Sequence, residues 1–154
     1  MKQLVLVLLA AALFAGGFSL FAQFGGTSPF PKDFLRWAGV KSTVVDPQSI
    51  AHIYANDNAV EGYKTGRFPD GSVIVYDLLE TKNLAGTTTE GATRRVDVMV
   101  KRSELYRTTG GWEFMSFPGG DPTATKLTVE RQAACSACHN QRKSHDFVFS
   151  EFRK

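Results

Sequence analysis

Close to its C-terminus the chain reads CSACH over residues 135–139. Two thiols three positions apart, followed at once by a histidine, are typical of sites that bind haem covalently. The thiols can bond the two vinyl groups of one porphyrin, and the adjacent imidazole can reach the iron from the same side. The spacing therefore predicts one haem c, with Cys135 and Cys138 as attachment points and His139 as an axial ligand of the iron.

Two other interpretations of the cysteine pair stay open at this point. Cys135 and Cys138 are the only cysteines of the chain, and an oxidising compartment would favour a disulfide or a redox Cys-x-x-Cys site. Zinc is the second alternative, but it would need further ligands from distant histidines.

An export signal is expected with this motif, because c-type haem is attached outside the cytoplasm in bacteria. Residues 1–22 carry a positive charge at Lys2, continue with the apolar run 4–15 and small residues, and end with Ala22 before Gln23, although Leu20 is less typical of a cleavage site. This pattern predicts a cleaved signal peptide and a periplasmic protein. An uncleaved membrane anchor is the alternative, because residues 4–24 nearly reach the roughly 20 apolar residues that a spanning helix needs.

The charge and the length of the chain limit which partners and how many domains are expected. The 154 residues carry a formal net charge of +3, from 18 Lys and Arg against 15 Asp and Glu. The charges are mixed along the chain without a long basic run, which argues against nucleic acid as a partner. After the signal peptide we expect one domain, with a leader and short helix over 23–48 and the haem-binding domain over 49–154.

Three segments have the composition of β-strands, namely 72–79, 95–102 and 111–117. The middle segment places Val96, Val98 and Val100 on one face and Asp97, Met99 and Lys101 on the other. The third alternates Trp112, Phe114 and Ser116 with Glu113, Met115 and Phe117 in the same way. Residues 49–54 fit a strand or a helix. The Gly/Thr-rich segment 84–93 is expected to be a loop, and 68–71 (FPDG) a turn.

Three segments are expected to be helical. Residues 31–37 suit a short helix with Phe34, Leu35 and Trp37 on its apolar side and Gly39 as its stop. A second helix should begin at an N-cap, Asp57 or Asn58, bury Ala59, Val60 and Tyr63 and end at Gly66. Residues 128–139 should be helical and carry the CSACH motif. Together these elements predict an α+β fold with a mainly antiparallel sheet. Such a pattern excludes the helical electron carriers and the four-helix cytochromes c′.

With these elements in place, the chain resembles the cytochrome P-460 family, which includes the cytochromes c′-beta. The similar stretches, in order, are His52-Ile53-Tyr54 with Asn56, the turn Phe68–Ser72, Val98–Lys101, Gly110–Trp112 with Phe114 and Phe117, CSACH, and Asp146–Phe149. They extend over most of the mature chain, and their order and spacing carry the resemblance.

The resemblance implies one c-type haem on an antiparallel sheet, often in a homodimer, with His139 proximal and the distal side open. Cytochromes P-460 oxidise hydroxylamine with a haem cross-linked to a lysine, whereas cytochromes c′-beta bind nitric oxide or carbon monoxide beneath apolar side chains. The cross-linking lysine is expected on the strand after the PDG turn. That strand, 72–80, has no lysine, and Tyr76 stands near the expected place; Lys64, Lys82 and Lys101 lie nearby.

Other residues remain candidates for the distal side. His52, His145, Met99 and Met115 could supply a sixth ligand, although each suits an ordinary surface or packing role better. Tyr76, Arg95, Lys101 and Glu113 could provide a polar distal group, but we expect them to be solvated strand residues. The aromatic residues expected in the core or as haem walls are Phe68, Phe114, Phe117, Phe147 and Phe149.

The sequence thus predicts an exported mono-haem cytochrome whose five-coordinate iron binds nitric oxide or another small diatomic or nitrogen-oxide ligand. Two alternatives stay open. One is an enzyme that oxidises hydroxylamine or nitric oxide. The other is an electron-transfer cytochrome with a six-coordinate haem and a periplasmic redox partner.

Overall fold

The computed structural model describes residues 30–124 and 127–152. The expected signal peptide, residues 1–22, and its cleavage point therefore lie outside the described residues. Within the described ranges, no helix combines the length and apolar character needed to cross a bilayer.

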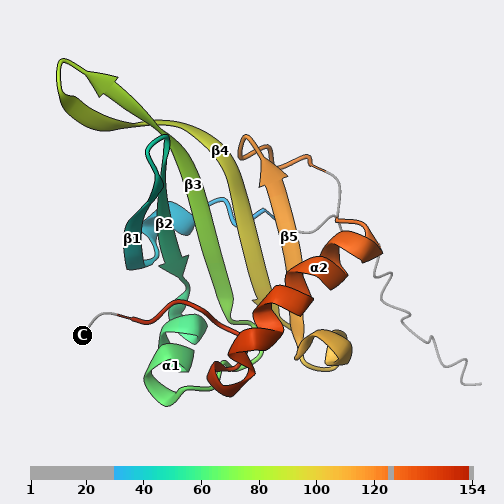
Figure 1. Ribbon diagram of the computed structural model, residues 1–154. Helices are drawn as coiled ribbons and strands as arrows, with labels where there is room; N and C mark the ends of the chain where they lie inside the picture. The colour runs from blue at the N-terminus through green and yellow to red at the C-terminus, as the bar shows by residue number, and fades with distance from the viewer. Residues whose placement is uncertain (1–29, 125–126, 153–154) are drawn as a thin grey trace, which may run out of the picture.

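One antiparallel sheet of five strands forms the centre of the molecule, and its strands are neighbours in chain order from β1 to β5 (Figure 1). The strands are β1 (Ala38–Asp46), β2 (Ser49–Ala55), β3 (Val73–Leu84), β4 (Thr87–Lys101) and β5 (Trp112–Pro118). Residues 49–54, which fitted either a strand or a helix, thus lie in a strand. The α+β class is confirmed.

Two α-helices accompany the sheet, α1 (Asp57–Thr65) and α2 (Val129–His139). Short 3₁₀ helices occupy Phe34–Arg36, Arg107–Thr109 and Asn140–His145. In Figure 1, α2 crosses in front of β5, α1 lies at the lower end of the sheet, and the N-terminal segment runs behind the strands. The predicted helix that carries the CSACH motif is therefore confirmed as α2.

Both faces of the sheet are covered by apolar clusters, as the alternation of β4 and β5 predicts. On the α2 side, Ile74, Met99 and Phe114 pack with Phe68 and Trp112. On the opposite side the cluster comprises Phe34, Val75, Val96, Val98, Val100, Met115 and Phe117. Because successive residues of a strand point to opposite faces, each residue of β2–β5 can be assigned to one of these two sides.

The α1 helix begins one residue earlier than expected. Its N-cap is Asn56, rather than Asp57 or Asn58, and the Asn56 side chain accepts a hydrogen bond from the Ala59 N–H at 3.0 Å. The end is as predicted, because Gly66 adopts the left-handed conformation, with φ of 77°, that closes a helix. Ala59 is buried and Tyr63 packs against the same core.

The N-terminal elements differ from the sequence expectation. Only Phe34–Arg36 is helical, as a single 3₁₀ turn, and Leu35 is exposed rather than on the apolar side. Gly39 is not a helix stop, because it lies inside β1. This strand was not predicted, since its sequence AGVKSTVVD lacks a regular alternation and only one of its residues is buried.

The segment 84–93, expected as a loop, is mostly strand. Lys82, Asn83 and Leu84 pair with Thr89, Thr88 and Thr87, so that β3 and β4 form a long hairpin. The turn itself is only Ala85-Gly86, with positive φ values of 49° and 82°. The Thr residues are β-branched and therefore suit a strand. The glycines in the same segment led to the expectation of a loop.

Candidate haem site

Helix α2 places Cys135, Cys138 and His139 near one another on its surface. The Thr128 hydroxyl caps the helix by accepting a hydrogen bond from the Arg131 N–H at 3.3 Å. Positions three and four apart in a helix are neighbours on its surface, so Cys135 lies beside both Cys138 and His139. Cys135 is half-buried against the core on this side of the sheet, whereas Cys138 is exposed, and both thiols are free.

The surroundings of α2 fit a large apolar group. No residue of this helix is buried, although it lies against β5, and Val129 is 80% exposed. A helix that packs on a sheet ordinarily buries an apolar stripe. A haem held by Cys135 and Cys138 would supply that missing contact. Across the described residues, no group of three or more His, Cys, Asp or Glu could hold a metal ion, which leaves the zinc alternative without further ligands.

His139 is oriented by its neighbours. Its Nδ1 atom lies 2.7 Å from the carbonyl oxygen of Phe147. The rings of Phe114 and Phe149 both contact the imidazole, with ring centroids 5.0 and 5.1 Å from its centroid. Burial lowers the pKa of His139, and the hydrogen bond to Phe147 offsets part of that effect. Because a carbonyl can only accept, Nδ1 carries the proton, and Nε2 keeps the lone pair that an iron ligand needs.

The Phe147 carbonyl belongs to an unusual turn. Asp146 and Phe147 both have positive φ, at 50° and 66°. Two consecutive non-glycine residues in this region cost roughly 1–3 kcal/mol each and persist only where the surroundings enforce them. The 3₁₀ helix before the turn contributes to this, since the Phe147 N–H donates to the Arg142 carbonyl at 2.9 Å.

Lys101 is not the solvated strand residue that we expected. Its ammonium is buried and forms an ion pair with the Asp146 carboxylate at 2.7 Å. Glu113 differs in the same way: it is buried on the opposite side of the sheet, 3.4 Å from Arg102. Burial of a charge is tolerated when it is paired and hydrogen-bonded. Neither residue is available as a free polar group on the α2 side of the sheet.

Tyr76 and Arg95, the other two predicted polar candidates, lie with Asp97 on the α2 side of β3 and β4. Tyr76 is cross-strand from Asp97. The Arg95 Nε and the Ser116 hydroxyl both donate to the Asp97 carboxylate at 2.6 Å. Burial raises the pKa of the Cys135 thiol, and the nearby Asp97 carboxylate raises it further. Asp97 is therefore a neighbour of the motif that the sequence did not single out.

The four candidate sixth ligands occupy different places. His52 and Met115 lie on the opposite side of the sheet from α2, where His52 contacts Ser42 and Glu90. His145 is exposed and bonds to the Ser144 hydroxyl at 3.0 Å. Met99 lies on the α2 side but is buried between Ile74 and Phe114 in the register of the strands.

The three lysines near the expected cross-link position also differ. Lys82 lies on β3 itself, because the strand extends to Leu84, but it is exposed on the hairpin. Lys64 is in the last turn of α1, where it pairs with Glu61. Lys101 is committed to Asp146. Tyr76 remains the half-buried residue of β3 on the α2 side near the expected place.

The five aromatic candidates divide between two roles. Phe68, Phe114 and Phe117 are buried, but Phe117 belongs to the opposite side of the sheet. Phe147 packs against the core beside Gly110, and Phe149 is 45% exposed. The walls around His139 are therefore Phe114 and Phe149.

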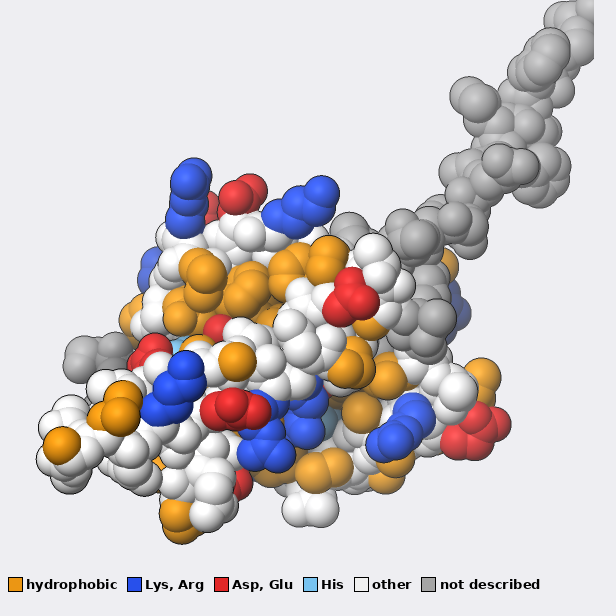
Figure 2. All heavy atoms as spheres, turned by 90° about the horizontal axis from the view of Figure 1, so that it is seen from above, with side chains coloured by type: hydrophobic (Ala, Val, Ile, Leu, Met, Phe, Trp, Pro, Cys, Tyr) orange, Lys and Arg blue, Asp and Glu red, His pale blue; other side chains and the backbone are white. Residues whose placement is uncertain are grey.

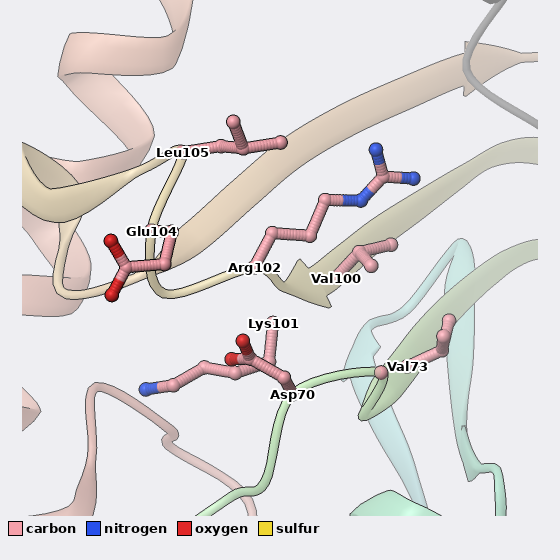
Figure 3. A pocket seen from close by; sticks show the side chains of 8 residues that line it. Asp70, Val73, Val100, Lys101, Arg102, Glu104 and Leu105 are labelled. Atoms are coloured by element: carbon pink, nitrogen blue, oxygen red, sulfur yellow. The ribbon is translucent and has the colours of Figure 1, made fainter. Parts of the chain in front are cut away.

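Other surface features lie away from the motif. A shallow hollow of about 330 Å³ is lined by Asp70, Val73, Val100 and Leu105 among others, and it contains neither cysteine (Figure 3). In the view from above, Lys and Arg side chains are scattered among Asp and Glu side chains, and apolar side chains adjoin one another in the upper middle of the view (Figure 2). No continuous basic field is visible on this face, in agreement with the mixed charges of the sequence.

Sequence reasoning missed Asp146 as the partner of Lys101 and Phe147 as the partner of His139. Asp146 lies in one of the stretches that carry the family resemblance, but its role depends on a contact with Lys101, 45 positions away in the sequence.

The family model described as Cytochrome P460 matches residues 31–150, which is most of the chain. A comparison with curated proteins returns no significant match.

Proposed function

Since the chain belongs to the cytochrome P460 family, and is thus a haem cytochrome, we propose that it carries one haem c with a five-coordinate iron. Cys135 and Cys138 would form the thioether bonds, and His139 would be the axial ligand. The haem would supply an iron with one position open to a small ligand. We propose nitric oxide, or another diatomic or nitrogen-oxide molecule, as that ligand.

The single observation that carries this proposal is the hydrogen bond that fixes the tautomer of the His139 imidazole. Its Nδ1 proton is held by the Phe147 carbonyl at 2.7 Å, so that Nε2 is free to bind a metal. The positions of the alternative ligands support an open site. His52 and Met115 lie across the sheet, and Met99 is 9% exposed within the core.

Carbon monoxide tests the open site, because it binds ferrous haem directly where a position is free and must first displace the protein ligand where it is not. We expect ferrous holoprotein to bind carbon monoxide and nitric oxide without displacing a protein ligand, and to turn over hydroxylamine no faster than a haem peptide. Failure to bind either gas would overturn the proposal.

One observation favours the second candidate, hydroxylamine oxidation. Three polar residues lie together on the α2 side of the sheet, namely Tyr76, Arg95 and Asp97. This group includes side chains that could accept protons during an oxidation. In that case Asp97→Asn should reduce hydroxylamine turnover while leaving carbon monoxide binding unchanged. Peptide mapping supplies a second criterion, since a lysine peptide joined to the CSACH–haem peptide would assign the protein to the hydroxylamine-oxidising branch.

We further propose that the protein is exported to the periplasm, exchanges electrons with a redox partner there and forms a homodimer. The sequence of residues 1–22 supports export. Fractionation and N-terminal sequencing of the mature protein should give a periplasmic chain that begins at Gln23. A chain that stays in the membrane with Met1 intact would favour the anchor. The mass of the holoprotein in solution tests the dimer.

A further inference from the structure

The contacts of Asp146 reach three separate parts of the fold. Its Oδ1 atom accepts a hydrogen bond from the Lys101 ammonium at 2.7 Å, and its Oδ2 atom accepts one from the Phe68 N–H at 2.9 Å. Its backbone carbonyl accepts a third from the Trp112 indole at 2.8 Å. Asp146 is thus fixed to β4, to the segment after α1 and to β5.

Lys101 is itself held in one position. Its ammonium donates to the Gly110 carbonyl at 2.9 Å and lies 5.0 Å from the centre of the Trp112 ring. Figure 3 shows its side chain directed away from those of its chain neighbours Val100 and Arg102. The Lys101 side chain is 8% exposed and that of Asp146 is 15% exposed, so this ion pair is screened much less than a surface pair.

The next residue along the chain binds the histidine. The Phe147 carbonyl accepts the Nδ1 proton of His139 at 2.7 Å, and its position depends on the left-handed turn at Asp146 and Phe147. The Phe147 ring adds to this restraint, because it fills the space beside Gly110, where a Cβ would lie only 2.2 Å from it. The contacts of Asp146 therefore determine where the acceptor of the His139 proton lies.

We propose that Asp146, held by Lys101, is a positioning residue that sets the hydrogen bond of the proximal imidazole and through it the electron density on the haem iron. This inference rests on the proposed function, since it takes His139 as the iron ligand. An acceptor fixed against Nδ1–H makes the imidazole a stronger electron donor. Hydrogen bonds of this kind are one of the means by which a protein adjusts a haem.

The test uses ferrous holoprotein without added gas and two readouts, the iron–histidine stretching frequency from resonance Raman and the reduction potential. Asp146→Gly keeps the left-handed turn accessible but removes both carboxylate contacts. Lys101→Met removes the ammonium and keeps an apolar stem. We expect both variants to shift the stretch to lower wavenumber and to raise the potential.

Asp146→Asn is the conservative variant, because asparagine also tolerates the left-handed conformation and keeps one acceptor oxygen. We expect it to fold and to give a smaller shift in the same direction. Glu151→Gln is the matched control. It removes an ion pair with Arg142, at 3.5 Å in the same C-terminal segment, without touching Asp146 or His139. It should shift neither readout.

Parental values of both readouts in Asp146→Asn and Lys101→Met would overturn the inference. So would equal shifts in Glu151→Gln. A failure of the proposed function looks different. If the haem binds no gas or has a second protein ligand, the parental protein alone shows this. The reduction potentials of the variants, compared with the parental potential, would still measure the effect of Asp146.

Discussion

Two single residues, Cys135 and Cys138, can each form one covalent bond to the porphyrin. Cys135→Ala or Cys138→Ala alone should leave the haem attached by the remaining thioether. The double variant should lose its haem to solvent on denaturation. A haem stain of the denatured protein after electrophoresis provides the measurement. Stained protein in the double variant would show that the cysteines are not the attachment points.

Another single residue, Asp77, is buried on the side of the sheet opposite α2. Its Oδ1 atom has no hydrogen-bond partner among the described residues, and burial raises the pKa of its carboxyl group. Facing it, His52 opposes this shift and Glu90 adds to it. Between the ordinary aspartate pKa of about 4 and the raised pKa of the folded protein, the folded state holds a proton that the unfolded chain has released. Stability is therefore lost as the pH rises through that interval.

Asp77→Asn removes this loss. We expect its free energy of unfolding to exceed that of the parent at pH 7, and the difference to shrink towards pH 4. Asp70→Asn is the contrasting control. Hydrogen bonds from Ser103 lower the pKa of Asp70, so that its stabilisation is present at neutral pH and lost on acidification. Denaturant titrations between pH 4 and pH 7 measure the free energy of unfolding of both variants. If the difference between Asp77→Asn and the parent does not change with pH, the raised pKa of Asp77 is contradicted.

On the scale of elements, Asn56 joins α1 to the following turn and strand. Its side chain accepts hydrogen bonds from Ala59 N–H at 3.0 Å and Val73 N–H at 2.9 Å, and donates to the Gly71 carbonyl at 2.9 Å. Asn56→Ala should therefore destabilise the protein by about 2 to 4 kcal/mol. Asn56→Asp keeps both acceptor contacts and should lose less than half as much. Equal losses in the two variants, measured by urea unfolding, would rule out the capping role.

The elements also show where sequence reasoning succeeds. The central strands were predictable because β-branched residues alternate with others, and residues on both faces of β4 are buried from Val96 to Lys101. The edge strand β1 was not, because a strand paired on one side and largely exposed needs no apolar pattern. The hairpin around Ala85-Gly86 was not predicted for a similar reason, since the ends of β3 and β4 that form it are mostly solvent-exposed.

For the molecule as a whole, the haem should be needed to order α2 but not the sheet. The sheet has apolar clusters on both faces, whereas α2 buries no residue of its own. We expect hydrogen exchange of the double cysteine variant to be much faster in Val129–His139 than in the holoprotein, with little change in β3 and β4. Equal protection of α2 in both forms would mean that the helix is held by the polypeptide alone.

The site was predictable in one part and not in another. CSACH is local in the sequence, so Cys135, Cys138 and His139 could be named from spacing alone. The Lys101–Asp146 pair and the Phe147 carbonyl could not, because they depend on a turn that the fold brings beside β4 and α2. Lys101 was noted as a charge on an alternating strand, and no sequence signal distinguishes a buried charge from a solvated one.

The visible absorption spectrum of the ferrous holoprotein tests the central claim most directly. A haem bound through Cys135 and Cys138, with His139 as its one protein ligand, should give a high-spin ferrous spectrum with an ordinary c-type Soret band. Sharp low-spin α and β bands would contradict the account by revealing a second protein ligand. A strongly red-shifted ferrous band would contradict it by revealing a cross-linked macrocycle.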